Sequence, residues 1–420
     1  MGGETGAGER EEGLVAQDPD AKMTVQDVVI AGGGVSGLSI ALHLKMLGVP
    51  RVTVLERHHA GAGQSGRAAG IIRALVNNEA VASILMESLR FVRNFKERFG
   101  QPIPFHQPGY LLVNDAAASA TMDQTIANAN LAGCGASRIS ASDAVALQPG
   151  LRCGSEDIYA YEPGALHLDP MLATQVLARV ARGLGVRIEE GCQVDSILID
   201  GSRAMGVSTR EGRFLADSTV LATSVLGAAQ LKQIGVEVPV FPHRAEMAFF
   251  SVFPQSTHRL QRILSDARTL LYMRPEGVDQ MFVGWREGDR IATPDDFAAV
   301  DPENYRQTSG YPTLADMRNR LTGTLPFMTD GYVHRTYACV YDYTPDGMPI
   351  LDEAEGRSGL YFALGYSGGG FSLSPWVGAA MARFITERVK SPEMHLLRLS
   401  RFREGTLLSW SNAAGRDRDA

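Results

Sequence analysis

The sequence has few cysteines and no metal-binding arrangement of them. Its 420 residues contain four, Cys134, Cys153, Cys192 and Cys339, and none forms a CxxC pair or another metal-ligand spacing. This excludes the common cysteine-rich metal centres and a fold that depends on disulfides. The N-terminus also lacks the basic start and apolar centre of a signal peptide. We therefore expect reduced thiols, no metal and a cytoplasmic location.

The chain also lacks long apolar runs and an excess of basic residues. No run approaches the roughly 18 apolar residues that span a membrane. The net charge of −7 does not match the basic surface that nucleic acids require. No internal repeat is visible. We therefore expect no transmembrane span and no nucleic-acid partner.

What the chain does contain is typical of a folded globular protein. It is 45% hydrophobic and 21% charged, and its length is too great for one small core. Two domains are therefore predicted. Residues 1–22 consist largely of Gly, Glu, Ala and Asp without apolar patterning, which predicts a disordered tail.

The most informative stretch is residues 25–56, which predict a strand, a glycine turn, a helix and a second strand ending in an acid. Gly32 permits a tight turn, Gly34 allows close approach to a pyrophosphate, and Gly37 allows the helix to pack on the strand. The helix start at Val35 and Ser36 would direct its N–H groups to the phosphates. The alternative is a tight turn that binds nothing.

Glu56 lies 19 residues after Gly37 (56 − 37), at the end of the second strand. A carboxylate there can accept hydrogen bonds from ribose hydroxyls, which favours FAD or NAD over NADP. Arg57 follows directly. A run of small residues comes next, which allows backbone to approach a flat or charged ligand. Its members are Ser65, Gly66, Arg67, Ala68, Ala69 and Gly70.

A second glycine-rich turn follows the predicted strand at residues 360–364. It runs Gly365-Tyr366-Ser367-Gly368-Gly369-Gly370-Phe371 before a helix expected at residues 374–389. A helix N-terminus here would stabilise the negative charge of a reduced flavin. The alternative is an ordinary turn between strand and helix. Because both motifs occur in one chain, we favour one long cofactor that spans both turns.

Between these turns the nucleotide-binding pattern is interrupted and then resumes at residues 220–224, where a strand enters a small-residue turn at Thr223. Residues 239–253 and 269–285 predict strands of a more antiparallel domain. The interruption indicates an inserted domain.

Several motifs together resemble the D-amino-acid-oxidase/sarcosine-oxidase superfamily of FAD-dependent amine oxidoreductases. They are the first glycine turn with Glu56-Arg57, residues 65–73, Gly191-Cys192-Gln193-Val194, and Thr344-Pro345-Asp346-Gly347-Met348-Pro349-Ile350 with the second glycine turn. The resemblance extends from about residue 24 to 390. It implies an α/β fold in which a Rossmann-like FAD-binding domain is interleaved with a mixed-sheet α+β substrate domain.

The expected boundaries assign residues 23–105, 160–238 and 340–395 to the FAD-binding domain. Residues 106–159 and 239–339 form the expected substrate domain, and residues 396–420 a C-terminal extension. The resemblance also implies that Val194 lies at the adenine end of FAD. The remaining expected cofactor residues are Thr223, Gly365, Gly368, Gly369, Gly370, Phe371 and Ser372.

The resemblance assigns further roles to single residues. Cys339 precedes Val340-Tyr341-Asp342-Tyr343-Thr344-Pro345-Asp346, a pattern that matches the covalent flavin attachment site of monomeric sarcosine oxidase. It is a candidate anchor, and the alternative is a small buried thiol. Arg73 matches the arginine that holds the substrate carboxylate, although the residue pattern alone also allows a surface or ion-paired arginine. Tyr341 matches the active-site tyrosine.

The chain departs from the family at two positions. Ser372 stands where relatives have a second, lysine ligand for the carboxylate, and Phe282 stands where monomeric sarcosine oxidase has its oxygen-activating lysine. Arg286 could compensate in either role, and Trp285 is expected to line the pocket with Tyr341. The second departure weakens the case for fast reaction with oxygen.

The favoured function is therefore oxidation of the C–N bond of a small secondary or N-methylated amine, or of a cyclic amino acid, by hydride transfer to flavin N5. Oxygen is one candidate electron acceptor. Another alternative is an amine dehydrogenase that passes electrons to a quinone or a protein. A third is a non-catalytic assembly factor that retains the flavin fold.

Overall fold

The computed structural model describes residues 23–285 and 302–408. The predicted tail at residues 1–22, Arg286 and the end of the predicted C-terminal extension lie outside the described residues.

The first of two eight-stranded sheets begins with the apolar run at the N-terminus. Its main order is β10-β11-β12-β1-β2-β9, and β19 pairs with both β12 and β18. β1 pairs in parallel with β2 and β12, so the carboxyl ends of these strands meet at one edge. The strands are β1 (Met23–Ala31), β2 (Val52–Glu56), β9 (Arg187–Glu190), β10 (Val194–Asp200), β11 (Arg203–Thr209), β12 (Gly212–Leu221), β18 (Ile350–Glu353) and β19 (Leu360–Leu364).

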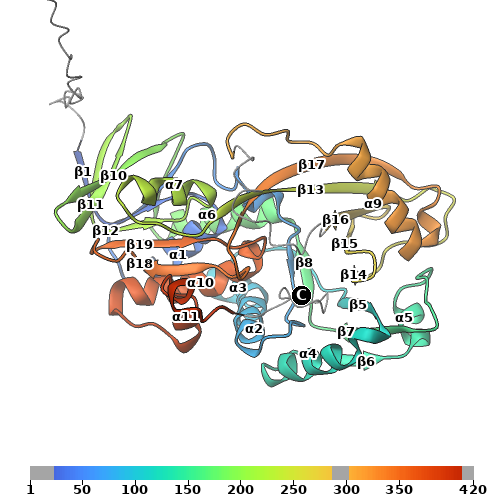
Figure 1. The fold of residues 1–420 in the computed structure, drawn as a ribbon. Helices are drawn as coiled ribbons and strands as arrows, with labels where there is room; N and C mark the ends of the chain where they lie inside the picture. The colour runs from blue at the N-terminus through green and yellow to red at the C-terminus, as the bar shows by residue number, and fades with distance from the viewer. Residues whose placement is uncertain (1–22, 286–301, 409–420) are drawn as a thin grey trace, which may run out of the picture.

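Helices pack on this sheet and on one another (Figure 1). α1 and α10 cross so closely that a Cβ on Gly378 would lie 2.1 Å from the Ser39 Oγ. Only glycine fits at this crossing. The helices are α1 (Val35–Met46), α2 (Glu79–Arg93), α3 (Phe95–Phe99), α6 (Pro170–Gly183), α7 (Val225–Gln233), α10 (Gly370–Glu387), α11 (Pro392–Leu396) and α12 (Arg401–Glu404).

The second sheet has the order β17-β13-β16-β15-β14-β5-β7-β6 and is mostly antiparallel. One face packs against α9 through an apolar cluster that includes Met317 and Leu321. The strands are β5 (Tyr110–Asp115), β6 (Ser137–Ile139), β7 (Asp157–Glu162), β13 (Phe241–Ser251), β14 (Ile263–Asp266), β15 (Leu271–Glu276), β16 (Gln280–Trp285) and β17 (Tyr332–Tyr343). The helices are α4 (Ser119–Leu131), α5 (Ala141–Leu147) and α9 (Tyr311–Thr324).

A small third sheet has the order β3-β8-β4. Its strands are β3 (Ile71–Ile72), β8 (Leu166–Leu168) and β4 (Phe105–His106), and three short 3-10 turns are η1 (Ser65–Arg67), η2 (Ala116–Ala118) and η3 (Pro326–Met328). The predicted α/β class is confirmed. The predicted boundaries at residues 159/160 and 339/340 fall inside β7 and β17, and the division into domains stays a proposal.

One predicted helix boundary is wrong. α10 begins at Gly370 instead of residue 374. Ser140 caps α5 and forms a capping box with Asp143. Residues 159–168 contain most of β7 and all of β8. Their pairing with β5 and β3 decides this, and such partners are distant in sequence.

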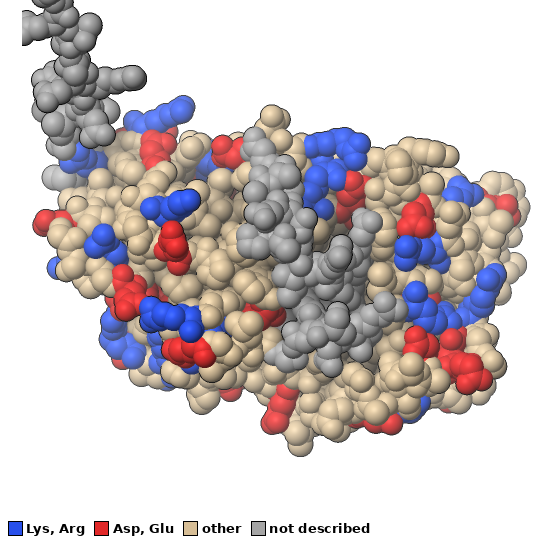
Figure 2. Space-filling model, viewed as in Figure 1, with Lys and Arg blue, Asp and Glu red and all other residues tan. Residues whose placement is uncertain are grey.

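The surface shown in Figure 2 carries basic and acidic side chains interspersed, without a continuous patch of one sign among the described residues. None of the helices in the described ranges has the length and apolar character needed to cross a membrane.

Candidate functional site

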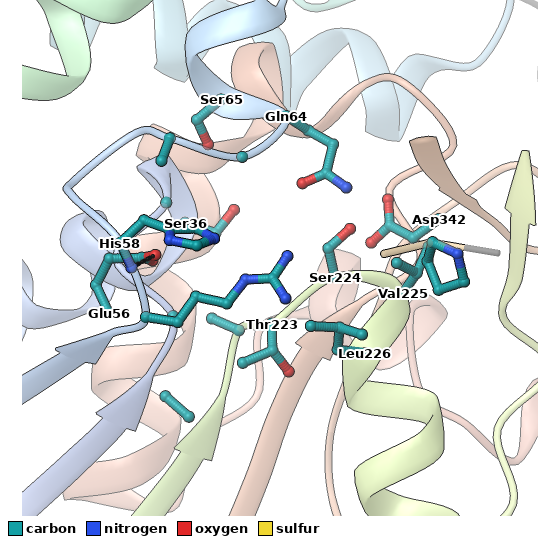
Figure 3. Close-up of a pocket in the computed structure, with 18 of the residues that line it drawn as sticks. Ser36, Glu56, His58, Gln64, Ser65, Thr223, Ser224, Val225, Leu226 and Asp342 are labelled. Carbon is teal, nitrogen blue, oxygen red and sulfur yellow. Dashed lines mark hydrogen bonds between the residues drawn. The ribbon is translucent and has the colours of Figure 1, made fainter. Parts of the chain in front are cut away.

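A cavity of about 510 Å³ opens where the carboxyl ends of β1, β2 and β12 meet the end of β17 and the turn before α10. Figure 3 shows side chains from these separate segments converging on it. Fifteen predicted site residues line this cavity: Gly32, Gly34, Val35, Ser36, Glu56, Arg57, Ser65, Arg67, Ala68, Val194, Thr223, Tyr341, Gly368, Gly370 and Phe371.

The first glycine turn is shaped by close backbone contacts. Gly32 has φ +107°, and a Cβ there would lie 2.3 Å from the carbonyl oxygen of Ala222. A Cβ on Gly37 would lie 2.1 Å from the carbonyl oxygen of Gly32. Both positions exclude any side chain, so the turn brings α1 directly to the ends of β1 and β12.

The N-terminus of α1 faces the cavity without a capping side chain, because its N-cap residue is Gly34. The Val35 N–H donates to the Ser65 Oγ at 2.9 Å. The Glu56 carboxylate accepts from the N–H of Gly33 at 2.8 Å and of His58 at 2.9 Å. These bonds fix an acidic group at the end of β2, as the sequence predicted.

The second glycine turn brings another helix N-terminus to the same cavity. α10 begins at Gly370 after Gly369, which also has no capping side chain. The Tyr341 ring lies 3.3 Å from the position that a Cβ on Gly368 would take. The turn therefore approaches the end of β17 closely, and both predicted glycine turns open onto one space.

Asp342 and Ser224 are functional candidates that the sequence analysis did not select. Both line the cavity, and Figure 3 shows them on adjacent walls. Asp342 accepts from the Gly365 N–H at 2.8 Å. Burial raises the pKa of this carboxyl to about 6, against the opposing effect of the hydrogen bonds from Gly365 and Tyr366. Ser224 has φ +55°, a strained conformation for a residue with a side chain. Proximity to Tyr341 in sequence was the only signal for Asp342.

Residues 302–310, which we call the strap, form part of the cavity wall. Glu303, Tyr305 and Gln307 line the cavity from this segment. Glu303 forms an ion pair with Arg57 at 2.7 Å. On the other side, Arg244 of β13 donates to the strap carbonyls of Arg306 at 2.9 Å and of Thr308 at 2.7 Å. No sequence motif identified the strap, because its contacts with Arg57 and Arg244 join residues that are far apart in the sequence.

The residues present fit FAD. Two uncapped helix N-termini suit anionic phosphates, and Arg57 and Arg67 add positive charge. The buried Tyr366 hydroxyl has no hydrogen-bond partner among the described residues, although Tyr366 lines the cavity. A buried hydroxyl normally has a partner, which a polar ligand would supply.

Other predicted cofactor residues shape the site without lining the cavity. They are Gly37, Gly66, Ala69, Gly70, Cys339, Gly365, Gly369 and Ser372. A Cβ on Gly70 would lie 2.1 Å from the Leu168 carbonyl oxygen, so this glycine permits a close backbone crossing. Ser372 lies in the first turn of α10, where its hydroxyl donates to the Gly369 carbonyl at 3.0 Å.

Cys339 is buried in a cluster on the side of the second sheet that includes Tyr341. We call Phe249, Tyr272, Phe282, Tyr337 and Tyr341 the aromatic face, and the same cluster contains Ala69. Burial raises the pKa of the Cys339 thiol to about 12, although a hydrogen bond to Tyr341 opposes this. The thiol is therefore protonated at neutral pH in this environment.

Arg73 is buried beside the aromatic ring of Tyr110, with its guanidinium carbon 4.7 Å from the ring centre. It donates to the Leu75 carbonyl oxygen. Glu162 holds the same segment, because it accepts from the N–H groups of Ala74 and Leu75 at 2.8 to 3.0 Å. Arg73 is not among the residues that line the cavity.

Trp285, which was expected to line the pocket with Tyr341, is not among the residues that line this cavity. Trp285 packs against the apolar cluster beneath α9, and Phe282 belongs to the aromatic face. Side chains at odd spacing along a strand point to opposite faces of the sheet. The Arg320 guanidinium of α9 lies 5.1 Å from the Trp285 ring centre. Arg286 lies outside the described residues.

Known proteins resemble this chain in sequence. It is 25% identical to 4-methylaminobutanoate oxidase (formaldehyde-forming) of Paenarthrobacter nicotinovorans, over 89% of this chain and only 45% of that protein. It is 25% identical to sarcosine oxidase subunit beta of an Arthrobacter species, over 94% of this chain and 96% of the relative. The chain thus spans less than half of the first relative and nearly all of the second.

Solved structures show the same fold. L-proline dehydrogenase from P. horikoshii superposes with a TM-score of 0.83 at 24% identity, covering 92% of this chain and all of the other. Glycine oxidase from Geobacillus kaustophilus gives a TM-score of 0.75 at 21% identity, covering 90% and 99%. A family model described as FAD dependent oxidoreductase (DAO) matches residues 27–384. The chain belongs to this DAO family of FAD-dependent oxidoreductases.

Proposed function

We propose that this chain oxidises the carbon–nitrogen bond of a small secondary or N-methylated amine, or of a cyclic amino acid. The observation that carries the proposal is the position of Tyr341. This residue lines the cavity onto which both glycine turns open, and it also belongs to the aromatic face. An amine next to this face would be placed beside the cofactor and away from water. Two relatives are named for sarcosine and 4-methylaminobutanoate, and both of these compounds are N-methylated.

FAD, when bound, accepts the hydride from the carbon next to the amine nitrogen. Loss of this hydride would leave the substrate as an iminium ion, which water hydrolyses to a shorter amine and a carbonyl compound. Burial raises the pKa of the Tyr341 hydroxyl well above its usual range, so it stays protonated and can donate a hydrogen bond. Hydride transfer from a neutral amine needs no dedicated base on the protein.

Arg73 is proposed to bind a carboxylate on the substrate. Replacing it with Ala should raise KM at least tenfold for a carboxylate-bearing N-methyl amine such as sarcosine. An N-methyl amine without a carboxylate is the matched control, and its KM should not change. Anaerobic loss of the flavin's visible absorbance measures reduction directly. If KM for sarcosine is unchanged, Arg73 instead has a structural role, which includes its contacts with Leu75 and Tyr110.

A dehydrogenase is the second candidate for the same chemistry. None of the described residues that line the cavity is a lysine. Phe282 is fully buried at the position that matches the oxygen-activating lysine of monomeric sarcosine oxidase. This favours a quinone or protein acceptor over oxygen. Turnover with an artificial acceptor should exceed turnover with oxygen. Equal or faster turnover with oxygen would favour the oxidase.

Covalent attachment of FAD through Cys339 is proposed from its position beside Tyr341 and Ala69. After acid precipitation, flavin absorbance should stay with the protein, and Cys339→Ser should release it to the supernatant. Release from the unaltered protein would leave Cys339 as a buried thiol. The same measurement leaves the amine proposal intact, because non-covalent FAD can accept the hydride equally well.

A further inference from the structure

A fully buried arginine lies in the C-terminal segment, beyond the region that the family model matches. Arg401 in α12 has a side chain that is 0% exposed, and its partner Asp346 is 1% exposed. The Arg401 Nε and Nη2 donate to the two carboxylate oxygens of Asp346 at 2.7 and 2.9 Å. The family match ends at residue 384, and neither residue lines the cavity.

The remaining donors of Arg401 are also used. Nη2 donates to the Met348 carbonyl oxygen at 2.8 Å, and Nη1 donates to those of Leu397 at 2.9 Å and Arg398 at 3.1 Å. A guanidinium has five N–H groups, and all five therefore have acceptors. Arg401 has no donor left for a ligand, so its effect must pass through the backbone that it holds.

Asp346 connects Arg401 to Thr344, because its carboxylate contacts both side chains. The Thr344 hydroxyl lies 3.2 Å from the Asp346 carboxylate and 2.8 Å from the Met348 carbonyl oxygen. The Thr344 N–H donates to the Ser367 Oγ at 3.1 Å. A Cβ on Gly365 would lie 2.4 Å from the Thr344 methyl group. The turn after β17 thus presses directly on the second glycine turn.

Ser367 is the point where the strain in that turn is concentrated. It has φ +50°, which residues with a side chain rarely adopt. Its N–H donates to the Asp342 carbonyl oxygen at 2.9 Å. Gly368 and Gly370, which line the cavity, follow directly. Such a conformation persists only where the surroundings hold it in place.

We propose that Arg401 is a positioning residue for FAD. Through Asp346 and Thr344 it holds the second glycine turn in the shape that the cofactor requires. The C-terminal segment would then be part of the cofactor site, although none of its residues up to 408 lines the cavity. The inference rests on the FAD dependence of the family and not on the identity of the substrate.

The test compares two variants that each break a buried ion pair. Arg401→Met removes the pair with Asp346. Arg268→Met removes the pairs with Asp157 and with Asp266 in the second sheet. The Asp266 side chain is 0% exposed and lies 2.7 Å from Arg268. Neither Arg268 nor Asp266 lines the cavity. All proteins carry Cys339→Ala, so that a covalent bond cannot hide FAD release.

The Kd for FAD is measured by titration, together with the visible circular dichroism of the bound flavin and the unfolding temperature. Arg401→Met should raise Kd at least tenfold and alter the flavin dichroism. Arg268→Met should lower the unfolding temperature by a similar amount but leave Kd within twofold. A Kd within twofold for Arg401→Met, or an equal rise for Arg268→Met, would overturn the proposal.

A double variant separates positioning from loss of stability. Asp346→Asn with Arg401→Met removes both charges, so no unpaired charge stays buried. Its unfolding temperature should recover more than its FAD affinity. Recovery of both together would mean that Arg401 acts only through stability, and would overturn the proposal. FAD binding is measured without substrate, so failure here leaves the amine proposal untouched.

Discussion

Asp342 is a buried carboxyl group in the wall of the cavity, and its pKa is raised. Burial raises its pKa from 3.8 to about 6. Between these values the folded protein binds a proton that the unfolded chain has lost. Stability contributed by this group therefore falls as the pH rises from about 4 to 6. Well below pH 4 the carboxyl group is neutral in both the folded and the unfolded chain, so its burial then costs no stability.

Asp342→Asn should remove this pH dependence, because an amide side chain does not titrate in this range. Its amide oxygen can still accept a hydrogen bond from the Gly365 N–H. Relative to the unaltered protein, the variant should gain roughly 3 kcal/mol between about pH 4 and 7, at about 1.4 kcal/mol for each tenfold change in proton affinity. Urea unfolding at several pH values measures this. Only the difference between the two proteins is interpreted, since burial lowers the pKa of His43 and His167 in both.

Parallel stability curves for the two proteins would contradict the prediction. They would mean that Asp342 keeps an ordinary pKa, and that the bonds from Gly365 and Tyr366 fully offset the effect of its burial.

At the scale of elements, the strap joins the two large sheets across the cavity. Arg57 at the end of β2 holds it through Glu303, and Arg244 of β13 holds its backbone. The Arg57 and Glu303 side chains are 34% and 58% exposed. An exposed ion pair contributes only about 0 to 1 kcal/mol. The ion pair between Glu303 and Arg57 therefore holds the strap only weakly.

Glu303→Gln should speed FAD release about two- to fivefold at low salt, and high salt should remove the difference. Stopped-flow flavin fluorescence in the Cys339→Ala background measures the rate. Asp123→Asn is the matched control, because it breaks the Arg138–Asp123 pair of similar exposure on α4, away from the cavity. An equal rate for Glu303→Gln and the control would show that the strap does not retain FAD.

At the scale of the molecule, the cavity is built from both large sheets. β1, β2 and β12 supply one side, and Tyr341 and Asp342 at the end of β17 supply the other. A ligand that binds only the folded protein stabilises it by about 2.7 kcal/mol at one hundred times its Kd. FAD should therefore stabilise both sheets together.

Tryptophan reporters test this coupling. Trp376 lies in α10 and Trp285 in β16, so two variants that each keep one of these and lack Trp410 report on the two sheets separately. FAD should raise the unfolding temperature seen by both reporters by the same several degrees. A rise at Trp376 alone would mean that the second sheet unfolds independently.

Local patterns in the sequence were sufficient for the first glycine turn and for membership of the family. Gly32, Gly34 and Gly37 have their roles because a turn, a helix and a strand meet within a few residues. Such contacts leave a spacing that can be read directly. The second glycine turn and Glu56 were identified in the same way. The element ends were less certain, since the start of α10 depends on how Gly369 and Gly370 pack.

Only the tertiary structure decided which residues complete the site. Asp342, the strap and Arg401 have partners far away in sequence. Sheet packing likewise decides that Trp285 lies on the α9 side of its strand. A spacing rule cannot encode contacts between segments that have no fixed separation. The chain itself determined the family and the cofactor, and long-range packing determined the walls of the cavity.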